Sequence, residues 1–164
     1  MQNKLTKLTY ILFYIIVHYV FIRFFIEIDS VQKKLASIYE LFELSQKELN
    51  LIISIGLVIF TLTYLLIQYL IAKFLVLIFV EKLKPKIEYV FIPKVFITIL
   101  NIIFISIFSI QTSWFYAFTA FFGAIFILMF TQFKSNTWKF SIIFSIPFLF
   151  DAITQLIREI NKLF

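Results

Sequence analysis

Apolar side chains fill five long stretches of the chain, and short polar segments separate these stretches. A helix of about 20 apolar residues is long enough to cross the roughly 30 Å of hydrocarbon in a bilayer. The pattern therefore predicts an all-α, polytopic membrane protein that forms a single domain over residues 1–164. It predicts about five transmembrane helices, at residues 8–28, 49–72, 93–110, 114–130 and 138–160.

Residues 30–44, between the first two spans, follow a different pattern. Apolar residues from Val31 to Phe42 recur at helical spacing opposite a charged face. This arrangement predicts an amphipathic interfacial helix on the membrane surface. Ser45 and Glu48 then have the spacing of a capping box, in which each side chain satisfies a backbone N–H of the other residue. The second span should therefore start near Gln46.

The second apolar stretch is too long for one span. It runs from Leu49 to Val80, about 32 residues or roughly 48 Å of helix. A lysine at position 73 indicates that the span itself ends near Ala72. The remainder, beginning at Phe74, should lie along the interface or meet another protein, so Lys73 and Phe74 are candidate partner contacts.

The last three spans carry their own local signals. Pro93 suits the first turn of the third span, because its missing N–H would be unpaired there anyway. Ser113 can cap the fourth span, which makes spans three and four an antiparallel hairpin. Small residues cluster within the fourth span and predict close helix packing. They are Ala117, Ala120, Gly123 and Ala124.

Composition narrows the class of protein. Hydrophobic residues make up 62% of the chain, with 24 Phe and no Cys. Disulfides and Cys-ligated metals are therefore excluded. The chain has no H-E-x-x-H motif, no paired carboxylates at catalytic spacing and no Gly-rich phosphate loop. We expect no catalytic residues, no metal site and no cofactor, and hence no enzyme.

The net charge of +6 is interpreted as a topology signal and not as nucleic-acid binding. With five spans, most lysines fall on one side, which should be cytoplasmic and should hold the N-terminus, while the C-terminus lies outside. These residues are Lys4, Lys7, Lys82, Lys84, Lys86, Lys94, Lys134 and Lys139. The acidic residues Glu40, Glu43 and Glu48 would then face outwards, where they are candidate contacts for a partner or a cationic peptide.

Asp151 interrupts the last apolar stretch one turn after Pro147. Counted along straight helices, Arg23 and Asp151 lie roughly 22 Å and 20 Å from the cytoplasmic ends of their spans. The two residues are therefore predicted to form a buried ion pair. Two alternatives stay open: the last span stops at Phe150 and the following residues lie at the interface, or Asp151 has a role with a proton or a substrate.

Other polar residues also lie within the spans. His18 sits near the middle of the first span and is more typical of a hydrogen-bonded core residue than of a proton relay. Gln68 and Asn101 are predicted to form hydrogen bonds between helices. None of these three residues marks an active site by its spacing alone.

Part of the chain resembles a known family. The segment from Val31 to Asn101 combines a surface amphipathic helix, a long second span with a lysine near its end, and an aromatic residue, Tyr89 or Phe91, that leads to Pro93. This segment resembles the YIP-type (Ypt-interacting-protein-like) family of small bacterial membrane proteins. The resemblance implies partnership with an ABC-type exporter and a role in antimicrobial peptide export or resistance.

Three functions follow from these observations. The first is a non-enzymatic accessory or immunity subunit of a membrane complex, with membrane lipids and an ABC transporter as partners, in a bacterial plasma membrane. The second is a structural subunit of an energy-converting complex in an organelle inner membrane, because many Phe and few Gly are typical of AT-rich genomes. The third is a small channel or transporter that uses Asp151.

The predicted topology can be tested directly, because the chain has no native cysteine. On intact cells, an impermeant thiol reagent should label a single cysteine introduced near residue 40 and should spare one near residue 134. Labelling near residue 134, or protection near residue 40, would show that the five-span arrangement is wrong.

Overall fold

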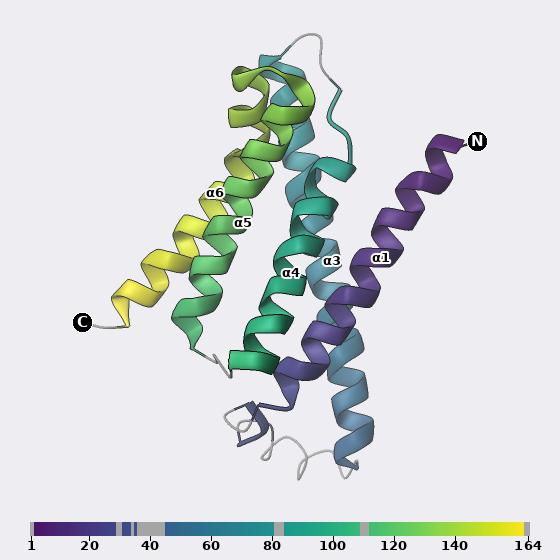
Figure 1. The fold of residues 1–164 in the computed structure, drawn as a ribbon, viewed down its shortest axis with the longest axis vertical. Helices are drawn as coiled ribbons and strands as arrows, with labels where there is room; N and C mark the ends of the chain where they lie inside the picture. The colour runs from purple at the N-terminus through teal and green to yellow at the C-terminus, as the bar shows by residue number, and fades with distance from the viewer. Residues whose placement is uncertain are drawn as a thin grey trace.

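The computed structural model describes residues 2–28, 31–33, 35, 45–80, 84–108 and 112–162. In these parts of the chain the regular structure is entirely helical (Figure 1). The long helices are α1 (Gln2–Ile26), α3 (Gln46–Phe79), α4 (Glu88–Phe108), α5 (Ser113–Ser135) and α6 (Trp138–Asn161).

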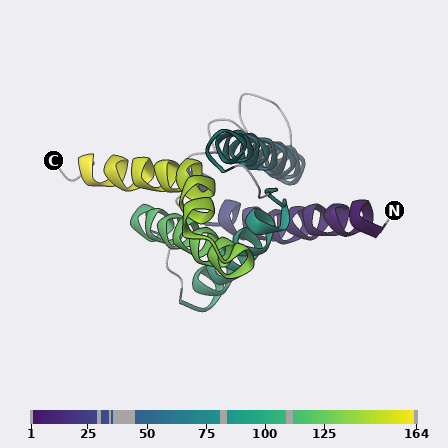
Figure 2. The ribbon, with the colours of Figure 1, turned by 90° about the horizontal axis from the view of Figure 1, so that it is seen from above.

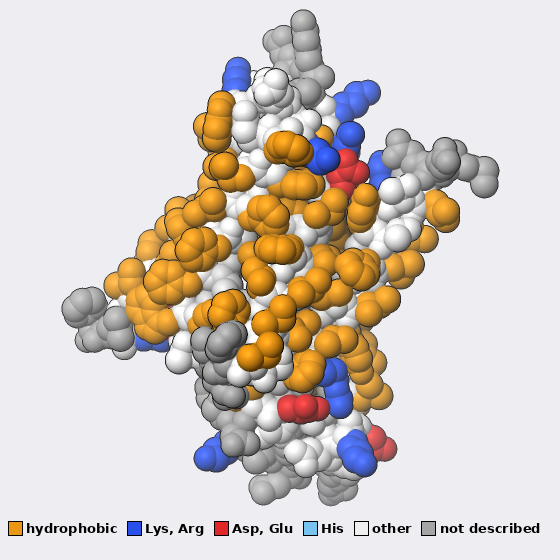
Figure 3. Space-filling view, in the orientation of Figure 1, with side chains coloured by type: hydrophobic (Ala, Val, Ile, Leu, Met, Phe, Trp, Pro, Cys, Tyr) orange, Lys and Arg blue, Asp and Glu red, His pale blue; other side chains and the backbone are white. Residues whose placement is uncertain are grey.

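All five helices are long and apolar enough to cross a membrane, which confirms the predicted multi-pass membrane protein. Many large apolar side chains point outwards; for example, 80% of Phe133 and 73% of Phe150 is exposed. Such a surface is stable against lipid and would be costly in water. On the face drawn in Figure 3, apolar side chains cover the middle, and charged side chains gather mainly near the two ends.

The five helices form a ring. Each helix packs mainly against two others, in the order α1, α4, α5, α6, α3 and back to α1. The view from above in Figure 2 follows the same order. In Figure 1, α1, α4 and α6 begin and α3 and α5 end towards the top, so successive helices alternate in direction. The ring brings one face of every helix to a common interior.

Aromatic side chains fill this interior at the end where α4 and α6 begin. We call Tyr89, Phe91, Phe140, Phe144 and Phe148 the aromatic cluster; at most 6% of each is exposed. Tyr89 makes edge-to-face contacts with Phe140 and Phe144, each with 6.0 Å between ring centroids. Aromatic pairs of this kind add about 0.5–1.5 kcal/mol beyond their buried area. The cluster therefore closes this end of the ring.

The predicted start of the third span was wrong. Helix α4 begins at Glu88, five residues before Pro93, which lies inside the helix. A proline there removes the hydrogen bond to the carbonyl of Tyr89. Burial of Tyr89, Val90 and Phe91 compensates for this loss and keeps the first turn helical.

The capping box at the start of α3 is confirmed. The Ser45 hydroxyl accepts a hydrogen bond from the Glu48 N–H at 3.4 Å, and the Glu48 carboxylate accepts one from the Ser45 N–H at 3.1 Å. Beyond Ala72 the helix continues without interruption to Phe79, a total of 34 residues. At roughly 51 Å, α3 is longer than the hydrocarbon layer, so it must tilt or project from it.

Most of the predicted interfacial helix at residues 30–44 lies outside the described residues. Positions 31–33 and 35 are helical, and the interfacial helix stays a prediction.

Helix α6 runs from Trp138 to Asn161 and does not stop at Phe150. In Figure 2 its C-terminal half points in a different direction from its first half. Pro147 lies within the helix, and a proline is the usual cause of such a bend because it interrupts the backbone hydrogen bonds. The bend carries the end of α6 away from α1.

The contact between α4 and α5 at Gly123 gives a test of the packing. A Cβ atom at Gly123 would lie 3.4 Å from Cγ1 of Ile97, whereas one at Gly56 would meet no atom within 4 Å. Gly123→Leu should therefore overpack the contact and destabilise the protein by about 1–3 kcal/mol. Gly123→Ala and the matched control Gly56→Leu should cost less, as measured by thermal unfolding in detergent. Equal losses for both leucine variants would contradict this packing.

Candidate functional site

Polar side chains from all five helices meet in the ring below the aromatic cluster. They line a cavity of about 200 Å³, which we call the central cavity. On each helix the contributing residues are mostly three or four positions apart, so they share one helical face. They are Tyr14, His18 and Phe21 of α1; Thr61, Tyr64, Leu65 and Gln68 of α3; Lys94, Ile97, Thr98 and Asn101 of α4; Tyr116, Thr119 and Ala120 of α5; and Asp151 and Gln155 of α6.

Asp151 contributes the carboxylate of the central cavity. Its Oδ1 accepts a hydrogen bond from the Tyr64 hydroxyl at 2.8 Å, and its Oδ2 accepts one from Gln155 Nε2 at 3.2 Å. Hydrogen bonds to an ionised group are roughly twice as strong as neutral ones. These two bonds explain how an ionisable residue is accommodated in an apolar helix, and the first bond also ties α6 to α3.

Lys94 contributes the positively charged side chain of the central cavity. Its ammonium makes no hydrogen bond and no ion pair with any residue that the structure describes, although its charge interacts with that of Asp151 at longer range. The two groups are not in direct contact, since their N···O distance exceeds 4.0 Å. An uncompensated charge inside a bilayer costs about 2.5–3.5 kcal/mol or more. The cavity therefore holds two opposite charges that are not paired with each other.

Several neutral polar atoms in the central cavity also lack partners. Within the described parts of the chain, the buried side-chain polar atoms without a hydrogen bond belong, apart from the Ser145 hydroxyl, to cavity residues. They are both ring nitrogens of His18, Nε2 of Gln68, Oδ1 of Asn101 and the Tyr116 hydroxyl. Each such atom costs about 1–3 kcal/mol unless something bonds to it. Their convergence on one cavity is typical of a site for a polar molecule.

A second cavity, the vestibule, adjoins the central cavity. It measures about 490 Å³ and shares Tyr64, Tyr116, Asp151 and Gln155 with it. It extends to Ser113, Arg158 and Glu159, at the end of the ring where α5 begins. The vestibule therefore lies beside the central cavity towards that end of the ring, while the aromatic cluster fills the other end.

Ser113 does not cap α5 as predicted. The N-cap residue is Thr112, whose side chain makes no capping bond. The Ser113 hydroxyl instead donates a hydrogen bond to the Glu159 carboxylate at 2.5 Å, and the same carboxylate pairs with Lys162. Glu159 is buried, with 8% of its surface exposed. One charge-assisted hydrogen bond, from Ser113 to Glu159, thus joins α5 to α6 at the vestibule rim.

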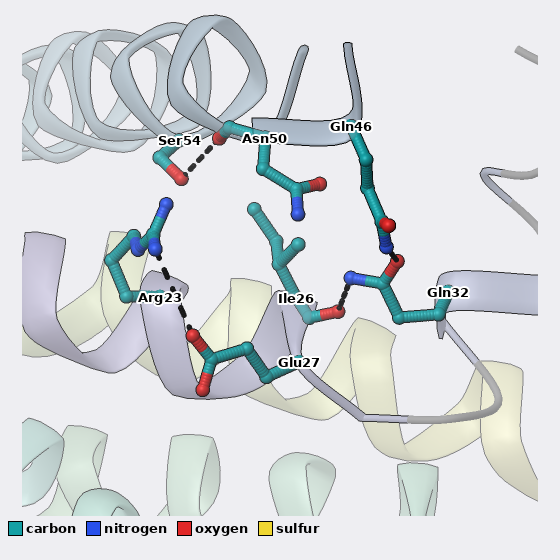
Figure 4. Close-up of polar contacts among 7 residues, drawn as sticks. All are labelled: Arg23, Ile26, Glu27, Gln32, Gln46, Asn50 and Ser54. Atoms are coloured by element: carbon teal, nitrogen blue, oxygen red, sulfur yellow. Dashed lines mark hydrogen bonds and ion pairs between the residues drawn. The ribbon is translucent and has the colours of Figure 1, made fainter. Parts of the chain in front are cut away.

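The structure does not bring Arg23 and Asp151 together. Arg23 Nη2 lies 3.7 Å from Glu27 Oε1, one helical turn away on α1. In Figure 4 the guanidinium points towards the part of α3 that carries Ser54. Asp151 bonds to Tyr64, ten residues or roughly 15 Å further along α3. The predicted depths of Arg23 and Asp151 came from counting residues along straight helices. Helix α6 changes direction, so the count did not give the right position for Asp151.

The residues predicted for helix packing and for partner contacts are not gathered in one site. Ala117, Gly123 and Ala124 are buried, and Gly123 lies against Ile97 of α4, whereas Ala120 lines the central cavity. Glu48 is exposed and serves the capping box. Lys73 and Phe74 are exposed on α3. Glu40 and Glu43 lie outside the described residues.

Sequence reasoning missed Lys94, Tyr64, Tyr116 and Gln155 as site residues. Lys94 was assigned to the cytoplasmic lysines, and Gln68 and Asn101 were expected to bond across helices. A signal was present nonetheless: each span carries polar residues three or four positions apart. Such a stripe in an apolar helix predicts a face turned away from lipid.

No protein-family model, curated protein sequence or solved structure matches this chain. The YIP-type resemblance, the exporter partner and the immunity role therefore stay predictions. Within the described residues, no group of three or more His, Asp or Glu side chains could hold a metal ion.

The contact between Asp151 and Tyr64 can be separated from the predicted ion pair by two double-mutant cycles. Tyr64→Phe and Asp151→Leu should be coupled by about 0.5–3 kcal/mol in detergent unfolding, because they share a hydrogen bond. Arg23→Leu and Asp151→Leu should be additive within about 0.5 kcal/mol, since they are far apart. Coupling in the second cycle without coupling in the first would reverse this assignment and restore the ion pair.

Proposed function

We propose that this protein is a small membrane transporter or channel that binds a small polar solute in the central cavity. The observation that carries the proposal is the convergence of unpaired polar atoms from α1, α3, α4 and α5 on one cavity in the membrane-spanning region. Intramembrane ionisable groups that face a cavity are typical of substrate or ion pathways. This is the function in which Asp151 has a direct role.

The charges in the cavity favour a zwitterionic solute, that is, one with both an anionic and a cationic group. The Lys94 ammonium has no hydrogen bond or ion pair with a described residue, so it suits the anionic group. Asp151 uses two hydrogen bonds and keeps further lone pairs for the cationic group. At about 200 Å³ the cavity is smaller than the roughly 300–1,000 Å³ of pockets for drug-sized ligands. A solute of amino-acid size fits these constraints.

The vestibule and the aromatic cluster support a transport role. The solute would reach the central cavity through the vestibule, past Arg158 and Glu159. Release at the other end would require the aromatic cluster to open, because Phe140 and Phe144 are almost completely buried there. Alternating access to one intramembrane site is the general behaviour of transporters.

Solute binding is tested with purified protein and a panel of amino acids as zwitterions, acetate as an anion and methylamine as a cation. A zwitterion should raise the thermal unfolding temperature. Lys94→Gln and Asp151→Asn should each weaken its binding by roughly 10–100-fold, because each replaces a charged partner of the solute with a neutral amide. Lys139→Gln and Glu27→Gln, which change charges outside the cavity, should bind like the original protein.

Transport is tested with the same proteins in vesicles. Uptake of the radiolabelled zwitterion should exceed that of protein-free vesicles and should fall in the two cavity variants but not in the two controls. If all four variants bind and take up the solute equally, or if no zwitterion binds, the proposed function is wrong.

A further inference from the structure

A groove lined by lysines lies at the opposite end of the ring from the vestibule. It measures about 510 Å³ and is formed by α1, α3 and the segment leading into α4. Four lysines from these three parts of the chain line it: Lys7, Lys73, Lys84 and Lys86. We call it the basic groove. In Figure 3, several Lys or Arg side chains surround one acidic side chain towards the top of the molecule.

Among the described residues, most of the positive charge of the basic groove has no acidic partner. The acidic residue that these residues contribute to its lining is Glu88, which lies 3.7 Å from the ammonium of Lys86. In the described part of the chain, Lys7, Lys73 and Lys84 have no carboxylate within 4.0 Å. Bringing like charges together is unfavourable unless an anion joins them. The groove is therefore complementary to a group with more than one negative oxygen, such as a phosphate.

The groove has a defined shape. The Tyr69 hydroxyl of α3 donates a hydrogen bond to the carbonyl of Pro85 at 3.2 Å. This bond fixes the segment that carries Lys84 and Lys86 against α3. Lys73 follows Tyr69 by one helical turn, so both lie on the same face of α3. Lysines that are distant in sequence are thus held on one concave surface.

Apolar side chains flank the charged surface. Leu77 lines the groove and is 60% exposed, and its neighbour on α3, Phe74, is 63% exposed. Both residues belong to the apolar surface of a helix long enough to span the membrane. A ligand that fits the groove should therefore combine an anionic headgroup with a hydrocarbon chain. A soluble phosphate would use the lysines but not these apolar residues.

We infer that the basic groove binds the phosphate headgroup of an anionic phospholipid, whose acyl chains lie along α3 beside Phe74 and Leu77. Basic pockets between transmembrane helices are known to bind such headgroups, and each lysine near an anionic membrane surface contributes roughly a fivefold gain in affinity. The inference does not depend on the solute proposed for the central cavity, since the two sites share no residue.

The test is native mass spectrometry of the full chain in detergent, titrated with phosphatidylglycerol, phosphatidylcholine or glycerol 3-phosphate. Phosphatidylglycerol should bind at least tenfold more tightly than phosphatidylcholine. The triple variant Lys7→Gln, Lys73→Gln, Lys84→Gln should bind phosphatidylglycerol roughly a hundredfold more weakly. The matched triple variant Lys47→Gln, Lys134→Gln, Lys139→Gln loses the same net charge outside the groove and should bind as the original protein does.

Three results would overturn the inference. Equal losses in the two triple variants would show a general effect of charge. Equal binding of the two lipids would show that the headgroup charge is not recognised. Full displacement of the lipid by equimolar glycerol 3-phosphate would identify a soluble phosphate ligand instead. If the groove triple variant does not fold, Lys7→Gln and Lys73→Gln are measured singly, each with an expected loss of about fivefold.

Discussion

The interior of a bilayer offers no hydrogen bonds, so every polar side chain at that depth needs a partner within the protein or a polar cavity. All five helices of this chain carry such side chains on one face. The ring arrangement turns these faces inwards and leaves the apolar faces to lipid. The hydrogen bond between Tyr64 and Asp151 is the clearest case, because it satisfies a carboxylate and joins two helices of the ring. The position of the cavity follows from this constraint.

The two halves of the ring interior differ in how tightly their side chains are packed. At one end, Phe and Tyr side chains fill the space between helices that have few small residues with which to approach closely. Rings packed edge to face are rigid and exclude water. At the other end, the part of α6 after Pro147 stays bonded to α5 through Glu159 and Ser113, and the vestibule lies between α3, α5 and this part of α6. The same five helices thus pack tightly at one end of the ring interior and leave cavities towards the other.

The helices were predictable because helix length and apolar content are local properties. The capping box at Ser45 and the five spans needed only neighbouring residues. The partners of Asp151 were not predictable in this way, because Tyr64 lies 87 positions away and its depth depends on tilt and bend. Lys94 was misread because a lysine near a helix end is usually a topology marker. Even so, Lys94, Thr98 and Asn101 recur at helical spacing, and that stripe was visible in the sequence.

The order of helices around the ring has a consequence for biosynthesis. Helices α3 and α4 follow each other in the chain but are not packed neighbours, because α1 lies between them. The ring is closed by the contact of α3 with α6, which is synthesised after the other four of these helices. Until then the polar faces of α3 and α4 lack the Asp151 carboxylate, to which Tyr64 of α3 donates a hydrogen bond in the folded protein. A nascent chain that stalls before Asp151 would expose Gln68, Lys94 and Asn101 to lipid. Such a chain would be a substrate for membrane quality control.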